Sequence, residues 1–201
     1  GNTTNVIDMA FTADGSRVVT ASAEGMIRWW DATVTSSPFV LKTPGTVYGV
    51  AFSPDGTRLA AACLNGEKPM RMWDVASCRE VLSASQGNLS AIAFSHDGTQ
   101  IVVGRSGTTV SSIIDSTGSE VATLPGHWWR TNCVAFNRNG DQVLSLGNGG
   151  KLLVHDIATK KLLQIKQFPD ETAGEGCRAA IKPDGTLIAV VSGHDTHLLD
   201  L

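Results

Sequence analysis

The hexapeptide Ala51-Phe52-Ser53-Pro54-Asp55-Gly56 is the most informative stretch of the chain, because variants of it occur four more times in the 201 residues. Each copy runs from a small residue through a large apolar residue into a polar turn that ends in glycine. The glycines are Gly15, Gly56, Gly98, Gly140 and Gly185, so consecutive copies lie 41, 42, 42 and 45 residues apart. A period of about 40 residues indicates one supersecondary unit stacked on the next.

A second anchor keeps the same period. An aspartate closes each unit, after Trp30 in the first and Trp73 in the second. The aspartates are Asp31, Asp74, Asp115, Asp156 and Asp200, with spacings of 43, 41, 41 and 44. Two independent anchors with one period predict five repeat units, at about 1–41, 42–83, 84–124, 125–166 and 167–201, in a single domain over 1–201.

Each unit has the pattern of β-strands. Tyr48, Val50 and Phe52 alternate with small residues, and a period of two is the signature of a strand. The Asp-Gly pair that follows favours a tight hairpin, because glycine adopts positive φ without steric cost. The next segment, Leu59–Ala62, is apolar throughout and suits a strand that is buried on both faces. No stretch of ten residues has a helical period, so the fold class is all-β.

The repeated sheets predict a β-propeller. A lone four-stranded sheet cannot bury two apolar faces, whereas sheets stacked around an axis can. Bulky residues of one unit would then meet the alanine and glycine face of its neighbour.

These residues resemble the WD-repeat propeller family, especially its bacterial members, over nearly the whole chain. Gly126-His127, the Ser53–Gly56 turn, Ser22 and the tryptophans Trp30 and Trp73 match the family pattern. The resemblance implies a hydrogen-bonded tetrad of His, Ser, Asp and Trp inside each blade. No unit carries all four residues, so we expect packing and strand ladders to hold the blades.

The number of blades leaves several architectures open. Members of the family most often have seven blades, so five units indicate a piece of a longer protein or a half completed by a second copy. A closed five-bladed ring is the other possibility, and it would make Asp8 and Arg178 neighbours. The fifth unit lacks a fourth strand, and its unpaired edge predicts possible self-association.

Composition narrows the function classes. The net charge of −3 and the lack of a long apolar run favour neither a nucleic acid nor a membrane partner. Four cysteines without zinc-site spacing predict no metal centre, and we expect no cofactor. A soluble protein, with the cytoplasm favoured as its compartment, is the corresponding expectation.

Four residues that lie close in sequence are candidates for catalysis: Ser192, His194, Asp195 and His197. In a continuous strand His194 and His197 would point to opposite faces, and Ser192 and Asp195 match structural positions of the repeat. We therefore predict that the protein is not an enzyme. His96 and His155 are expected on the surface.

The third-to-fourth linker is the predicted binding site. It is three residues longer than the loops at 44–46 and 86–88, and it carries Trp128, Trp129 and Arg130, of the types enriched in interface hot spots. His127 in the same linker and Arg105 at a strand end complete the candidate set. Either both tryptophans cap the blade core, or one packs inward while the other is presented; Arg105 either reaches the same rim or pairs with an acid.

Taken together, the sequence predicts a non-catalytic scaffold that binds a protein or peptide through the loops that connect the blades. The acidic linker 168–175 is either a second contact or a solvated loop. The alternative is a small-ligand or enzymatic propeller that uses its central channel, although the inner strands offer mainly Ala, Gly and Ser.

Overall fold

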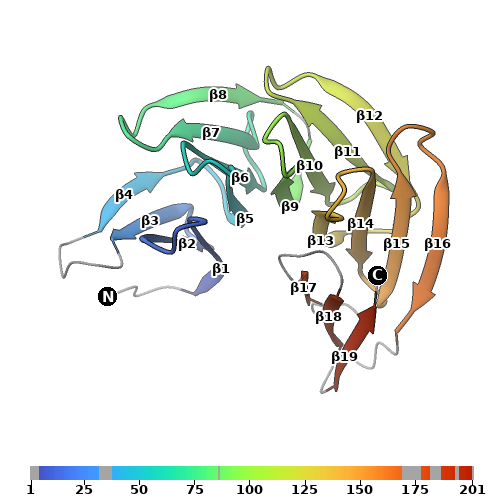
Figure 1. Ribbon diagram of the computed structural model, residues 1–201. Helices are drawn as coiled ribbons and strands as arrows, with labels where there is room; N and C mark the ends of the chain where they lie inside the picture. The colour runs from blue at the N-terminus through green and yellow to red at the C-terminus, as the bar shows by residue number, and fades with distance from the viewer. Residues whose placement is uncertain are drawn as a thin grey trace.

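Figure 1 shows the computed structural model, which describes residues 5–31, 38–85, 87–168, 178–181, 187–192 and 195–200. The regular secondary structure in these residues consists of β-strands alone. They form five antiparallel sheets, which follow one another around a common axis in the order of the chain (Figure 1). The predicted all-β propeller with five repeat units is confirmed.

Each sheet, or blade, is a meander that starts at the axis and runs outward. The first blade contains β1 (Val6–Phe11), β2 (Arg17–Ser22), β3 (Met26–Asp31) and β4 (Phe39–Lys42). The second contains β5 (Val47–Phe52), β6 (Arg58–Cys63), β7 (Met70–Asp74) and β8 (Glu80–Ala84). The third contains β9 (Leu89–Phe94), β10 (Gln100–Arg105), β11 (Val110–Asp115) and β12 (Glu120–Pro125). The fourth contains β13 (Thr131–Phe136), β14 (Gln142–Gly147), β15 (Lys151–Asp156) and β16 (Leu162–Gln167), and the fifth β17 (Arg178–Ile181), β18 (Leu187–Ser192) and β19 (Asp195–Asp200).

The repeated glycine makes the turn between the first two strands of a blade. Gly56 has a φ of 69°, and its N–H donates to the carbonyl oxygen of Ser53 at 2.9 Å. The carboxylate of Asp55 accepts hydrogen bonds from the Ser53 hydroxyl at 2.6 Å and the Thr57 N–H at 3.0 Å. These bonds, from the Ser53 hydroxyl first, lower the pKa of Asp55. The glycine is therefore needed for its positive φ, and the aspartate for its acceptor atoms.

Among the described residues, the hydrophobic core consists of four clusters, one between each pair of consecutive blades. Between the first two blades, the ring of Trp29 contacts that of Phe52 edge-on, with centroids 5.8 Å apart, beside the small side chain of Ala10. Each fully buried aliphatic or aromatic side chain stabilises the fold by about 1.5–3 kcal/mol.

A β-bulge recurs near the start of four inner strands. The ladder between β5 and β6 pairs Val47 with Cys63 and Gly49 with Ala62, which leaves Tyr48 as an extra residue. The same irregularity leaves one extra residue in each of the other three strands: Ile7, Ser90 and Asn132. A bulge bends its strand and redirects the side chain of the extra residue. Four inner strands therefore share a bulge that the sequence pattern did not reveal.

Contacts between inner strands follow chain order, from β1 to β5, β9, β13 and β17. The described parts of β1 and β17 share no comparable contact. Phe11 on β1 is accordingly 60% exposed, whereas Phe136 at the same place in the fourth blade is 4% exposed. The predicted neighbour of Asp8, the side chain of Arg178, lies outside the described residues; Asp8 itself accepts a hydrogen bond from the Val50 N–H of the second blade at 2.9 Å.

Candidate functional site

The β12–β13 linker, Gly126–Arg130, holds the predicted site on a backbone fixed by its neighbours. The Gly126 N–H donates to the Thr109 carbonyl at 2.9 Å, and the Trp129 carbonyl accepts from the Gly107 N–H at 2.6 Å. The Arg130 carbonyl accepts from the Asn148 N–H at 2.9 Å. These bonds reach turns of both the third and the fourth blade, so the linker is rigidly placed.

The linker is shorter than the sequence comparison suggested. It has five residues between strands, against four in the β4–β5 linker, Thr43–Thr46. The predicted excess of three residues was wrong, because β12 continues to Pro125 through its pairing with Val110.

Both tryptophans of this linker lie on the surface. Trp128 is 83% exposed and Trp129 is 65% exposed. The two alternatives in which one or both rings pack inward were therefore wrong, and both indoles are presented to solvent. Two adjacent exposed indoles on a fixed backbone form an apolar surface of a kind that partners bind.

His127 is the anchor of the linker and not part of its surface. Its side chain is 4% exposed, and Nε2 lies 2.8 Å from the hydroxyl of Ser145. The imidazole lies where a side chain at Gly147 would stand, because a Cβ there would be 2.2 Å from Nδ1. Burial lowers the pKa of His127 to about 4, which keeps the ring neutral near pH 7. The predicted place of His127 on the surface of the linker is therefore corrected: its side chain is buried, and only the indoles beside it in the linker are exposed.

Arg130 turns toward the propeller axis. Its guanidinium carbon lies 4.0 Å from the centroid of the Tyr48 ring, in a cation–π contact that joins the fourth blade to the second. Tyr48 is the extra residue of the bulge in β5. Sequence reasoning missed Tyr48, although a common signal exists: each of the four bulge residues precedes the turn phenylalanine by four positions.

Arg105 is engaged within its own blade. Its guanidinium forms an ion pair with Glu120 at the start of β12. Of the two predicted alternatives, pairing with an acid is the one found in the structure. Arg105 is therefore accounted for without a partner protein.

A cavity of about 170 Å³ lies at the axis, since its walls come from all five inner strands. Tyr48, Ser90 and Asn132, three of the bulge residues, line it together with Asp8. The amide nitrogen of Asn132 is buried and has no hydrogen-bond partner among the described residues. Arg130 of the tryptophan linker does not line the cavity itself, and it is linked to the cavity wall through its contact with the Tyr48 ring.

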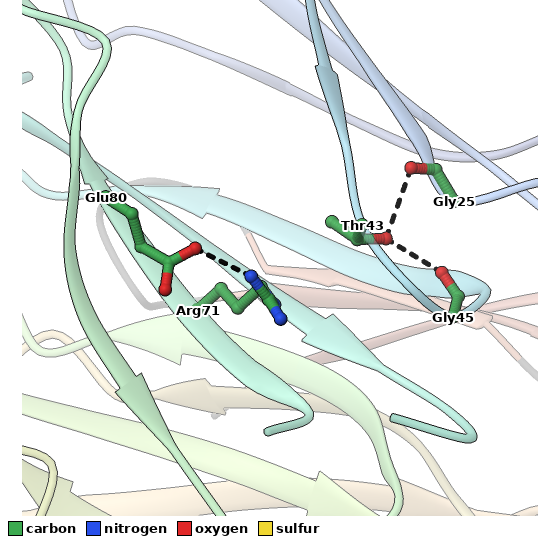
Figure 2. Close-up of polar contacts among 5 residues, drawn as sticks. All are labelled: Gly25, Thr43, Gly45, Arg71 and Glu80. Carbon is green, nitrogen blue, oxygen red and sulfur yellow. Dashed lines mark hydrogen bonds and ion pairs between the residues drawn. The ribbon is translucent and has the colours of Figure 1, made fainter. Parts of the chain in front are cut away.

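The corresponding linker after the first blade, β4–β5, is packed closely against its neighbours. Figure 2 shows the hydroxyl of Thr43 directed at the carbonyl oxygens of Gly25 and Gly45, at 3.1 and 2.8 Å. A Cβ at Gly45 would lie 1.9 Å from the carbonyl oxygen of Leu64, so this linker is packed against the β6–β7 turn. The same view shows Arg71 paired with Glu80 at 2.7 Å within the second blade.

Among the remaining histidines, His96 is exposed, as the sequence predicted, whereas His155 and His197 contact other parts of the fold. His155 is 1% exposed and its Nε2 lies 2.9 Å from the Pro125 carbonyl, so its predicted surface position was wrong. The ring of His197 lies against Phe168, with centroids 5.3 Å apart. His194 and the side chain of Ser192 lie outside the described residues. Across the described ranges, no group of three His, Cys, Asp or Glu side chains is placed to hold a metal ion.

Comparison with protein families gives one match along most of the chain. The model of the WD domain, G-beta repeat, matches residues 1–31, 36–67, 76–111 and 118–156. Transducin beta-like protein 3 of Rattus norvegicus is 33% identical over 100 residues, which are 48% of this chain and 12% of the rat protein. Autophagy-related protein 16 of Arabidopsis thaliana is 24% identical over 96% of this chain and 38% of its own length. The chain thus spans well under half of the length of each of these two relatives.

Solved structures also contain this fold. A chain of Kuenenia stuttgartiensis hydrazine synthase superposes with a TM-score of 0.81 at 18% identity, over 92% of this chain and 55% of that one. At this identity the likeness concerns the fold alone. No helix in the described part of the chain is long and apolar enough to cross a membrane.

Proposed function

The chain belongs to the WD40 repeat family, and from this premise we propose that it is a non-catalytic propeller that binds a protein or peptide partner through Trp128 and Trp129. Arg130 is the third member of the contact surface, and His127 holds the linker from below. Relatives such as transducin beta-like protein 3 and autophagy-related protein 16 are not named as enzymes, which agrees with this proposal.

The exposure of the two indoles carries the proposal. Side chains that are 83% and 65% exposed cost free energy in water, and their backbone is fixed by hydrogen bonds, so little order is lost on binding. Tryptophan and arginine are also the residues that most often dominate interface energies.

Capture of partners by the double variant Trp128→Ser/Trp129→Ser tests the proposal. Immobilised wild-type protein and the variant are exposed to lysate of the native host, and bound proteins are quantified by mass spectrometry. We expect at least one partner to be lost from the variant by 100-fold or more, since hot-spot residues contribute about 2–4 kcal/mol.

Leu163→Ser/Ile165→Ser is the matched control, because these β16 side chains are 55% and 54% exposed away from the linker. The control should retain the partner. Equal loss from both variants would show general stickiness of apolar surface and would refute the assignment to the β12–β13 linker.

The alternative, a ligand or substrate in the central channel, is less well supported. The axial cavity of about 170 Å³ is smaller than the 300–1,000 Å³ typical of small-molecule sites. A thermal-shift screen with metabolites tests this reading, which would gain support from a reproducible rise in melting temperature.

Self-association is a second candidate function, favoured by the two end blades. Among the described residues, β19 has a strand on one side only. Leu198 on this strand is 65% exposed, and Phe11 on the first blade is 60% exposed. Light scattering on a sizing column tests it: a dimer that Leu198→Ser converts to monomer would support pairing through the fifth blade, and a wild-type monomer would exclude it.

A further inference from the structure

The axial end of the proposed contact surface has a distinct chemical character. The recurrent bulge directs Tyr48 and Asn132 into the same cavity, and Arg130 lies over the Tyr48 ring. We call these three residues the axial mouth. The ladder does not require a side chain of any particular kind at a bulge, so the polar groups here are free to serve recognition.

Two donors of the axial mouth lack acceptors. The Nε of Arg130 and the amide nitrogen of Asn132 are buried, and neither has a hydrogen-bond partner among the described residues. Ser90, the third bulge residue of the cavity, is different, because its hydroxyl donates to the Thr131 carbonyl at 2.6 Å. A buried donor without a partner destabilises the fold, and more so when it is charged. The axial mouth therefore lacks an acceptor that a ligand can supply.

We propose that the axial mouth binds a carboxylate side chain, Asp or Glu, of the partner whose apolar residue docks on Trp128 and Trp129. This inference rests on the proposed function and names the chemistry of the partner. A planar carboxylate presents several lone pairs to a guanidinium and an amide at once, in a charge-assisted geometry.

Size and charge favour a carboxylate over other anions. The cavity of about 170 Å³ is smaller than the 300–1,000 Å³ typical of small-molecule sites, which favours a single side chain over a larger ligand. Asp8 also lines this cavity, and its carboxylate accepts a hydrogen bond from the Val50 N–H. A doubly charged phosphate would meet stronger repulsion from Asp8 than a singly charged carboxylate would.

Paired peptide libraries test the assignment. Acetylated and amidated heptapeptides carry Glu or Gln at the central position and random uncharged residues elsewhere, and peptides retained by immobilised protein are quantified by mass spectrometry. We expect the wild type to retain Glu peptides at least tenfold over Gln peptides. Arg130→Lys and Asn132→Leu should each reduce this preference at least fivefold.

Arg105→Gln is the control, because it removes a guanidinium that pairs with Glu120 outside the axial mouth. It should leave the preference unchanged. Melting temperatures of all variants verify folding, and Arg130→Lys preserves the charge, so a loss in that variant reports on geometry.

The outcomes separate the two proposals. Retention that requires Trp128 and Trp129 but does not distinguish Glu from Gln overturns the proposed role of the axial mouth. The proposed function is then left intact. A preference that survives both variants, or stronger retention of phosphoserine peptides than of Glu peptides, overturns the carboxylate assignment. No tryptophan-dependent retention of any library overturns both proposals.

Discussion

The β4–β5 and β12–β13 linkers occupy equivalent positions in the repeat, but the first is packed against its neighbours and the second exposes large apolar side chains. In both, the last residue before the inner strand accepts a hydrogen bond from the following β-turn: Thr46 from the Leu64 N–H and Arg130 from the Asn148 N–H. The residue before it is Gly45 in one linker and Trp129 in the other. Gly45 is packed against the Leu64 carbonyl, whereas Trp129 is 65% exposed.

The difference shows how one repeat separates stability from recognition. The shorter linker uses the buried hydroxyl of Thr43 to close the gap between blades. The longer one uses buried His127 for the same purpose, and its additional residue leaves room for two indoles outside. Substitutions in the first linker should therefore affect folding, and substitutions at the indoles of the third should affect binding alone.

Gly45→Ala should have the largest effect on this comparison. Its Cβ would lie 1.9 Å from a backbone oxygen, which only a shift of the linker can relieve, so we expect a loss of about 3–4 kcal/mol in the free energy of unfolding in urea. Gly66→Ala is the control, because its Cβ would lie 3.7 Å from Pro44, and it should change stability by less than about 1 kcal/mol. Equal effects of the two substitutions would show that the linker is loosely packed.

Acid should loosen the third linker and not the first. The pKa of His127 is about 4 in the fold against 6.5 in the unfolded chain, so the unfolded state binds more protons between these values. The stability is complete above pH 6.5, and about 3 kcal/mol is lost as the pH falls to 4. Lys151 and His155 disfavour the charged ring in the same direction as burial.

Hydrogen exchange at pH 7 and pH 4.5, corrected for intrinsic rates, measures this effect in residues 126–131 and 43–47. In His127→Gln the pH-dependent part should disappear from residues 126–131. Burial also lowers the pKa of His155, so any acid effect that survives in this variant belongs to other groups. A parallel loss of protection in both linkers of the wild type would contradict the local role of His127.

Thr43→Val should cost about 1 kcal/mol, because it removes one buried hydroxyl without changing the shape of the side chain. Thr46→Val removes a more exposed hydrogen bond to the Ala23 carbonyl and should cost less than about 0.5 kcal/mol. Urea unfolding of both variants gives the difference. The reverse order would mean that the outer bond closes the first linker.

Trp128→Ser/Trp129→Ser should have the smallest effect on stability, within about 0.5 kcal/mol of the wild type, because both side chains are exposed. Thermal unfolding monitored by circular dichroism is sufficient for this measurement. A large loss would place the indoles in the core in solution and would break the contrast between the linkers.

The repeat made the blades predictable, whereas the site depended on features without a period. Gly56 and Asp55 could be assigned from sequence because a turn with positive φ admits few residue types. The exposure of Trp129 and the burial of His155 could not, since both depend on which neighbouring strand ends where. The role of Tyr48 and Asn132 at the axis was missed, because a period of two identifies a strand, as it did for Tyr48, but does not show where a bulge interrupts the ladder.

The bulges at residues 7, 48, 90 and 132 have a consequence for how the molecule can change over generations. Each of these residues stands outside the register of its ladder, so its exchange leaves the pairing of the strands intact. Substitution of the three that line the axial cavity, Tyr48, Ser90 and Asn132, can therefore change the chemistry of the cavity wall while the strand pairing persists. The same independence makes these positions natural targets for a designer who wants a new specificity on an unchanged scaffold.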